Sequence, residues 1–301
     1  MRVAVTGASG MLGSAVLRQL SDKYELFAMS RTPGSSSKYI TWDCFDLLDT
    51  NLLQTWLKEK SPDVIIHCAA NINVDECENN TANAIALHVG VTTVIADYAD
   101  RFARKLIYIS TDSVFNGKLQ RPYTESDKTD PLNNYAKTKL LGEEPVLECN
   151  YGIVLRTNIL GRGFGRKATF FDWLLNGLRS KDSLKLFDDV LFSPITVDKC
   201  SAVIENLINA EIRGLFHCGT RDRVSKYEFG MLTAEIFQLP RDRLECVSVE
   251  TFCFAATRPK NMSLDSSKLQ NALNIILPTV ETTILDLHKN CADFNIEKSI
   301  I

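Results

Sequence analysis

The sequence predicts an α/β protein built on a doubly wound parallel sheet, with a smaller α/β lobe on its C-terminal side. Short apolar runs alternate with longer helical patterns through the first half of the chain. These runs show no alternation of polar and apolar residues, which indicates strands buried on both faces by covering helices. The first run also passes directly into a glycine-rich turn and a helical pattern, as in nucleotide-binding sheets of this class.

The elements of the first half follow from their apolar patterns. The runs expected to be strands are residues 2–6, 25–30, 39–42, 63–70, 105–110 and 152–157. The stretches with apolar residues at helical spacing, expected to be helices, are 11–20, 49–60, 80–103 and 134–148. Taken in order, they form repeated strand–helix–strand units.

The pattern becomes mixed after residue 158. Helices are expected at 170–178, 199–209, 226–237 and 280–288, and short strands at 185–188 and 214–219. We therefore expect residues 1–158 to form the NAD(P)-binding domain, with return segments near 195–219. Residues 159–301 should form mainly the substrate-binding lobe.

Composition excludes several classes of function. Apolar residues make up 45% and charged residues 24% of the chain, as in ordinary globular proteins, and the net charge of -3 argues against a nucleic-acid partner. The opening MRVAVTGASG has no apolar leader, and no apolar run is long enough to cross a bilayer, so we expect a cytoplasmic protein without membrane contact. The nine scattered cysteines predict reduced thiols, several of them in the core, and no metal site.

The glycine-rich turn predicts a dinucleotide site. Gly7, Gly10 and Gly13 have the spacing G-x-x-G-x-x-G. The first two permit a tight turn and a close backbone approach to a pyrophosphate, and Gly13 lets the helix pack on the strand. The free N–H groups of the following helix favour an anion. A turn that binds nothing is the alternative, but the strand before and the helix after argue against it.

The adenosine end of that site is expected after the second and third strands. Most NAD-binding sheets carry an acid after the second strand, whereas this chain has Ser30 and Arg31, which suit a 2′-phosphate. NADPH is therefore favoured, with NADH as the second option, unless Arg31 is only a solvated loop residue. Asp46 and Leu47 are placed to flank the adenine ring, although Asp46 is equally explained as a helix cap.

Tyr135 and Lys139 lie four residues apart in a helical stretch, so they share a face. A nearby ammonium lowers the pKa of a phenol from about 10, which predicts Tyr135 as a general acid and Lys139 as a ribose ligand. Thr111 follows the strand 105–110, at the sheet edge where such folds bind ligands, and its hydroxyl is placed to polarise a carbonyl. The alternatives are a buried Tyr beside a surface Lys, and a turn residue at position 111.

Together, the glycine turn, the Ser110-Thr111-Asp112 strand end and the Tyr135–Lys139 pair resemble the extended short-chain dehydrogenase/reductase family. A closer resemblance is to its dTDP-4-dehydrorhamnose reductase branch, the RmlD-like substrate-binding family. That resemblance covers nearly the whole chain in the branch's order and rests on residues 67–79, 110–117, 121–144 and 258–269.

The resemblance implies a Rossmann domain with a small substrate lobe, a homodimer, and hydride transfer from NADPH or NADH to the 4-keto group of a nucleotide-linked 6-deoxy sugar. It makes Tyr135 the proton donor, Lys139 the ribose ligand and Thr111 the carbonyl partner. The cofactor contacts that it implies are Ser9, Gly10, Met11, Leu12, Ala69, Ala70 and Asn71. The positions that it places at the substrate or in the substrate-lobe motif are Asp112, Ser113, Asn158, Arg258 and Asn261. Arg258 is equally explained as a bridge between the two lobes.

The chain departs from the branch at several positions. Ser113 stands where the branch has Tyr, and Asn158-Ile159 stands where an aromatic residue is usual, so aromatic surface is lost from the expected sugar pocket. His88 replaces an Asn and is explained as a core histidine more readily than as part of a proton relay. Pro145 is expected to interrupt the helix after the Tyr–Lys pair.

A different class of function stays open. Residues 145–152 and 214–232 are similar to the regulatory β-subunit of methionine adenosyltransferase, which shares this fold and acts through a partner. The complete set of Thr111, Tyr135 and Lys139 argues against a purely regulatory protein. An epimerase or a dehydratase is a third option, but a dehydratase usually carries more acids beside the Thr than Asp112 alone.

Overall fold

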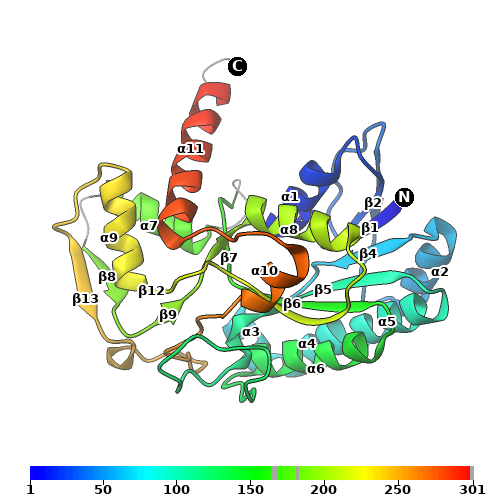
Figure 1. Ribbon diagram of the computed structural model, residues 1–301, viewed down its shortest axis with the longest axis horizontal. Helices are drawn as coiled ribbons and strands as arrows, with labels where there is room; N and C mark the ends of the chain where they lie inside the picture. The colour runs from blue at the N-terminus through cyan, green and yellow to red at the C-terminus, as the bar shows by residue number, and fades with distance from the viewer. Residues whose placement is uncertain (164–167, 181–182, 299–301) are drawn as a thin grey trace.

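The computed structural model describes residues 1–163, 168–180 and 183–298, with side chains through Cys291. In this described part, a seven-stranded sheet with helices on both faces fills one side of the molecule (Figure 1). The strand order is β11-β6-β5-β4-β1-β2-β3, and every neighbouring pair is parallel. The strands are β1 (Arg2–Thr6), β2 (Glu25–Ser30), β3 (Ile40–Cys44), β4 (Val64–His67), β5 (Lys105–Thr111), β6 (Gly152–Thr157) and β11 (Gly214–Cys218). The predicted doubly wound parallel sheet is confirmed.

Two apolar cores hold the helices to this sheet, because its central strands are buried on both faces. The helices on one face are α1 (Met11–Leu20), α8 (Val197–Asn209) and α10 (Ser267–Leu273). Those on the other face include α2 (Thr50–Lys60), α5 (Val91–Arg101) and α6 (Asn134–Glu148). The carboxyl ends of the parallel strands therefore meet at one edge of the sheet, beside the second lobe.

Some local predictions need correction. The strand predicted at 63–70 ends at His67, because the chain then turns away from the sheet. The helix predicted at 80–103 is divided into α4 (Thr81–Ile85), a π-helical turn (Ala86–Gly90) and α5, and α3 (Val74–Asn79) precedes it. Pro145 does not interrupt α6, which continues to Glu148. A proline removes one backbone N–H donor, and this one lies in the last turn.

The second lobe has its own core of Leu and Phe side chains. Its helices are α7 (Phe170–Arg179), α9 (Lys226–Ile236) and α11 (Val280–Lys298), which projects from the body of the molecule (Figure 1). Its paired short strands are β7 (Ile159–Leu160) with β10 (Ile195–Thr196), β8 (Leu184–Phe187) with β13 (Leu244–Val247), and β9 (Leu191–Phe192) with β12 (Val224–Ser225). Within 195–219, α8 and β11 pack with the main sheet, while the limits of the two domains stay a prediction.

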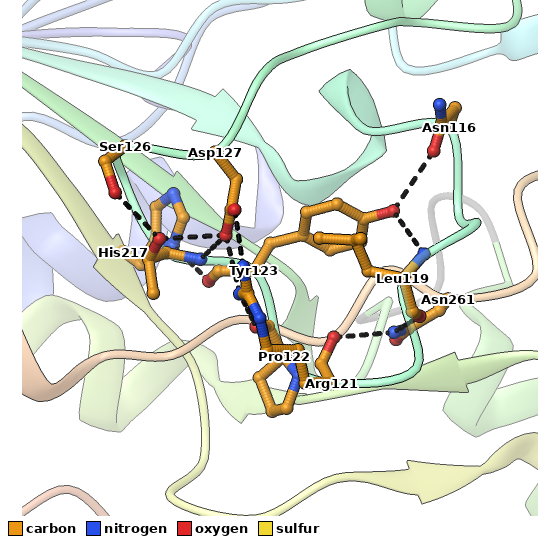
Figure 2. A network of polar contacts seen from close by, with 10 residues as sticks. Asn116, Leu119, Arg121, Pro122, Tyr123, Ser126, Asp127, His217 and Asn261 are labelled. Carbon is orange, nitrogen blue, oxygen red and sulfur yellow. Dashed lines mark hydrogen bonds and ion pairs between the residues drawn. The ribbon is translucent and has the colours of Figure 1, made fainter.

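A polar network ties the segment after residue 258 to the first domain (Figure 2). The Asn261 side-chain amide donates to the carbonyls of Leu119 at 2.7 Å and Arg121 at 2.9 Å. The Tyr123 hydroxyl donates to Asn116 Oδ1 at 3.2 Å, and the Tyr123 carbonyl lies 3.0 Å from His217 Nδ1. Asn261 is buried in this network, so its role in the substrate-lobe motif is to fix the chain path.

The described part of the chain can be searched for disulfides, for metal-binding clusters and for membrane-spanning helices. All nine cysteines lie within it as free thiols, and five of them are buried. Among the described residues, no cluster of His, Cys, Asp and Glu has the arrangement to hold a metal ion. A search of the same residues finds no helix with the length and apolar character to span a bilayer.

Candidate functional site

A cavity of about 610 Å³ lies at the carboxyl ends of the strands, and most of the predicted site residues line it. The predicted residues that line it are Gly7, Ser9, Gly10, Met11, Leu12, Gly13, Ser30, Arg31, Asp46, Leu47, Ala69, Ala70, Thr111, Asp112, Ser113, Tyr135, Lys139 and Asn158. Asn71 and Arg258 are not among its lining residues. The fold thus brings residues from six strand ends, those of β1 to β6, and from α6 to one site.

The glycine turn forms one end of the cavity. Gly7 has a φ of +64°, and a Cβ there would lie 2.7 Å from the Ala69 nitrogen. A Cβ on Gly13 would lie 2.3 Å from the Gly7 carbonyl oxygen, so α1 packs against the turn too closely for any side chain. No side chain caps the start of α1, which leaves its first N–H groups available to an anion. This cradle fits the pyrophosphate of a dinucleotide.

The adenosine end carries one exposed cation. Arg31 is exposed and lines the cavity. The Ser30 hydroxyl already donates to the Thr32 carbonyl at 2.5 Å and accepts from Trp42 Nε1 at 3.2 Å.

Asp49, and not Asp46, caps α2. Asp46 instead accepts from the Leu48 N–H at 3.0 Å in a local turn, so the helix-cap alternative for Asp46 is wrong.

The other end of the cavity holds Tyr135 and Lys139 on one face of α6. Asn133 caps this helix by accepting from the Ala136 N–H at 2.9 Å, which sets the helix start just before Tyr135. Lys139 is 2% exposed. Its ammonium donates to the Ile109 carbonyl at 2.7 Å and lies 4.0 Å from the centroid of the Tyr108 ring. Lys139 is therefore a fixed and buried side chain, not a surface lysine.

The electrostatics of this pair differ from the prediction. Burial raises the pKa of Tyr135 to about 12, against a hydrogen bond with Thr111 that lowers it. Burial also lowers the pKa of Lys139 to about 7, opposed by the charge of Glu143. The expectation of a lowered pKa for Tyr135 is thus wrong, because burial raises it and the charges of Asp112 and Cys77 raise it further. At neutral pH Tyr135 is a protonated phenol, the form that donates a proton.

Thr111 and Asp112 meet at the same end. The Thr111 hydroxyl accepts from the Ser113 N–H at 3.2 Å, so it caps a short 3-10 turn (Asp112–Val114) while lining the cavity. Asp112 is 2% exposed. Its carboxylate accepts from Thr111 Oγ1 and Ser113 Oγ, each at 3.2 Å, and from Asn158 Nδ2 at 2.6 Å. The two polar residues that replace the branch's aromatics therefore both bind Asp112.

A buried ion pair between Arg156 and Glu143 lies beside the site. Arg156 Nη2 donates to Glu143 Oε2 at 2.6 Å, and Ser110 Oγ donates to Glu143 Oε1 at 2.5 Å. The pair joins β5, β6 and α6 next to Thr111 and Lys139. The sequence analysis missed Glu143, although its position four residues after Lys139 on the same helix face was a usable signal.

His88 has a structural role. Its Nε2 accepts from the Asn71 N–H at 3.0 Å, so the proton is on Nδ1, which donates to Thr138 Oγ1 at 2.8 Å. Burial lowers the pKa of His88 to about 3, which keeps the ring neutral. His88 is therefore better explained as a core histidine than as part of a proton relay. Asn71 serves this contact and the start of α3, where its Oδ1 accepts from the Asn73 N–H at 3.1 Å.

Arg258 joins the two lobes. Its Nη2 lies 3.3 Å from Asp75 Oδ1 in α3, and its guanidinium lies 5.5 Å from the centroid of the Phe254 ring. This geometry favours the bridging alternative over a direct contact in the cavity.

Lys226 is a residue that sequence reasoning missed. It begins α9 in the second lobe, and its ammonium lies 3.2 Å from the centroid of Phe192 and 4.4 Å from that of Phe170. Burial lowers the pKa of Lys226 to about 7, and the charge of Asp112 opposes this shift. Nothing local in the sequence marks Lys226, because its partners lie in other elements.

Comparisons with known proteins show which chains this one is similar to. The family model described as "RmlD substrate binding domain" matches residues 1–292. The methionine adenosyltransferase 2 subunit beta of Mus musculus is 34% identical over 292 residues, covering 89% of this chain and 81% of that protein. The "Probable low-salt glycan biosynthesis reductase Agl14" of Haloferax volcanii is 29% identical over 303 residues, covering 98% of this chain and 100% of that protein.

Among solved structures, dTDP-4-dehydrorhamnose reductase from Bacillus anthracis in complex with NADP superposes with a TM-score of 0.84. It is 26% identical, with 96% of this chain and 99% of that chain covered. The family model and this superposition both cover nearly the whole length of the chain. The chain belongs to the RmlD substrate binding domain family, within the extended short-chain dehydrogenase/reductases.

Proposed function

We propose that the protein reduces the 4-keto group of a nucleotide-linked 6-deoxy sugar with NADPH, with NADH as the second option. One observation supports this most directly. Thr111, Tyr135 and Lys139 line the same cavity as the glycine turn and Arg31. A dinucleotide bound along that cavity would supply a hydride to a carbonyl beside the three side chains. The solved relative from Bacillus anthracis, which is named a reductase and holds NADP, supports the same proposal.

Each group of residues at the site has its own role in the proposed reaction. The glycine turn and the start of α1 bind the pyrophosphate, and Arg31 binds the 2′-phosphate. The Thr111 hydroxyl, whose single proton is donated to Asp112 in this structure, turns that proton to the carbonyl oxygen and stabilises the charge that develops there. Tyr135, a phenol at neutral pH, gives its proton to the same oxygen. Lys139, held by the Ile109 carbonyl, orients the ribose.

The test follows NADPH absorbance with several nucleotide-linked 4-keto-6-deoxy sugars. We expect Tyr135→Phe to lower kcat by about 10²- to 10⁴-fold while NADPH still raises the melting temperature. Tyr151→Phe is the matched control, because Tyr151 is exposed and precedes β6 at the opposite edge of the sheet. Full activity of Tyr135→Phe would refute the proposed mechanism.

A regulatory subunit is the second candidate. It is favoured by the 34% identity to a protein named as a subunit of methionine adenosyltransferase. The loss of aromatic surface at Ser113 and Asn158 also suits a chain that no longer binds a sugar. Absence of keto-sugar reduction, together with co-purification of a methionine adenosyltransferase catalytic subunit, would replace the reductase proposal with this one.

A further inference from the structure

The start of α6, the helix that carries Tyr135, is tied to a segment that comes from the second lobe. This crossing segment, residues 252–262, leads from the second lobe back to α10 on the main sheet. The Asn133 side-chain amide donates to the Thr257 carbonyl within it at 3.0 Å. Asn133 is 2% exposed and lies just before Tyr135 in the chain. A contact between the two lobes therefore lies at the start of the helix that holds the proposed proton donor.

Asn133 uses both ends of its side-chain amide. Its Oδ1 accepts from the Ala136 N–H at 2.9 Å and caps α6, while its Nδ2 donates to the Thr257 carbonyl. Asp and Ser cap a helix as well as Asn does, but Asp offers no donor and Ser has a single oxygen for both bonds. The cap alone needs only an acceptor. The donor end of Asn133 is therefore explained by its bond to the crossing segment.

The contacts around Asn133 form a closed ring that runs through α3. In the crossing segment, Arg258 Nη2 lies 3.3 Å from Asp75 Oδ1 of α3. One turn further along α3, Glu78 Oε2 accepts from the Asn134 N–H of α6 at 2.9 Å. The bond from Asn133 to the crossing segment closes the ring. The crossing segment, α3 and the start of α6 thus each contact the other two, so a shift of the crossing segment is passed to the start of α6.

The crossing segment is also fixed to the second lobe. The Leu191 N–H of β9 donates to the Lys260 carbonyl at 2.7 Å, and the Leu191 carbonyl accepts from the Met262 N–H at 2.8 Å. The Lys260 ammonium lies 3.3 Å from Asp189 Oδ2. These contacts lie only a few residues after Thr257. The position of the crossing segment therefore follows the position of the second lobe.

Tyr135 is sensitive to where α6 begins, because it lies in the first turn of that helix. Lys139 lies one turn further along and is held separately by the Ile109 carbonyl at 2.7 Å. A shift of the first turn would therefore move the phenol relative to Lys139 and Thr111, while the glycine turn after β1 would stay in place. A displacement of about 1 Å at a reacting group can lower the rate by about 100-fold.

We propose that Asn133 is a positioning residue through which the second lobe sets the place of the Tyr135 phenol, so that the proton donor is aligned only when that lobe is docked on the sheet domain. Among the described residues, Asn133 does not line the cavity, so it acts through Tyr135. The inference rests on the proposed reductase function and adds a link between the second lobe and the proton-transfer step.

The main test is Asn133→Asp, which keeps the size of the side chain and the cap but places an acceptor against the Thr257 carbonyl. Reduction of nucleotide-linked 4-keto-6-deoxy sugars by NADPH is measured. We expect kcat to fall by about 10- to 100-fold, with KM for NADPH unchanged. The ratio of kcat in water to kcat in D2O should rise, because proton transfer from a displaced phenol becomes slower. A purely structural loss would not change this ratio.

Two further variants separate positioning from folding. Asn133→Ser keeps a cap but is too short to reach the Thr257 carbonyl, so kcat should fall by about 3- to 10-fold without an added charge. Asn51→Asp makes the first chemical change at an exposed position in the first turn of α2, and should alter neither kcat nor the D2O ratio. The rise in melting temperature with NADPH shows that each variant is folded.

The outcomes distinguish this inference from the proposed function. If the wild-type protein reduces the sugars and both Asn133 variants match it in kcat and in the D2O ratio, the role of Asn133 is wrong while the reductase function stands. A lower kcat with an unchanged D2O ratio would also overturn the positioning role, because Asn133 would then serve only the fold. Reduction of no sugar by the wild-type protein would remove the proposed function and this inference with it.

Discussion

The two ends of the cavity are built in different ways. The glycine-turn end comes from consecutive residues, Gly7 to Gly13, and offers mainly backbone to its ligand. The substrate end, where Thr111, Asp112 and Tyr135 lie, comes from β5, β6 and α6, and offers side chains of which several are already hydrogen-bonded to one another. The comparison teaches that a ligand shared by a whole family is bound by local backbone geometry. The substrate end instead depends on side chains from elements that are distant in sequence.

The largest expected effect comes from a change at the glycine-turn end. Gly13→Ala places a Cβ 2.3 Å from the Gly7 carbonyl oxygen, so the turn or α1 must move. We expect the free energy of unfolding to fall by about 3 kcal/mol and the NADPH-dependent rise in melting temperature to disappear. Chemical denaturation and thermal shift measure the two effects.

The matched control for Gly13 is Gly90→Ala. A Cβ on Gly90 meets no atom within 4 Å, and its backbone is helical. This change should stabilise the protein by about 0.5–1 kcal/mol and leave NADPH binding intact. If both variants bind NADPH equally well, the steric account of the glycine-turn end is wrong.

A change at the substrate end should leave the binding of NADPH unaffected. Asn158→Ala removes the donor 2.6 Å from Asp112 Oδ2, in a site where burial already raises the pKa of that carboxyl. We expect a loss of about 2 kcal/mol in stability and a lower kcat/KM, with an unchanged thermal shift by NADPH. Asn176→Ala, on the exposed side of α7, is the control. A weakened NADPH response in Asn158→Ala alone would show that the two ends are not independent.

Arg31 tests the choice of cofactor within the glycine-turn end. Arg31→Ala should weaken NADPH binding by about tenfold, through loss of one charged hydrogen-bonding partner, and leave NADH binding unchanged. Lys38→Ala removes an exposed cation of the same loop and should change neither. Titration of each nucleotide by thermal shift gives the result. Equal losses for NADPH and NADH would mean that Arg31 does not contact a 2′-phosphate.

The last expected effect is a dependence of stability on pH. Burial lowers the pKa of Lys139 from 10.5 to about 7, so between these values the folded state binds fewer protons than the unfolded state. Burying the charged form of Lys139 lowers the free energy of unfolding, and this loss is complete below pH 7. The free energy of unfolding therefore rises with pH from about 7 to 10. Lys139→Met should be stabilising at pH 6 and less so at pH 9. A difference in melting temperature that is constant across this range would contradict the burial account.

Sequence patterns located the sheet and the glycine-turn end of the site well, because both are formed by residues that are neighbours in the sequence. β1, β5 and β6 are apolar runs buried on both faces, and the glycine turn directly follows β1, so neighbours in sequence carry the information. The patterns failed where a distant contact decides the outcome. The pKa of Tyr135 is raised where the prediction had it lowered, because burial in the folded chain removes water from the phenol, and no local sequence pattern gives that burial.

The sequence by itself determined that this chain forms a doubly wound parallel sheet, places a phosphate cradle after β1, and puts Tyr135 and Lys139 on one helix face. These features depend on spacing along the chain, which is read directly. Only the tertiary structure decided that Asn261 fixes a loop, that Arg258 joins the lobes, and that Lys226 lies over the Phe192 ring. Each of these pairs is made by segments far apart in sequence, and their energies depend on the burial that folding creates.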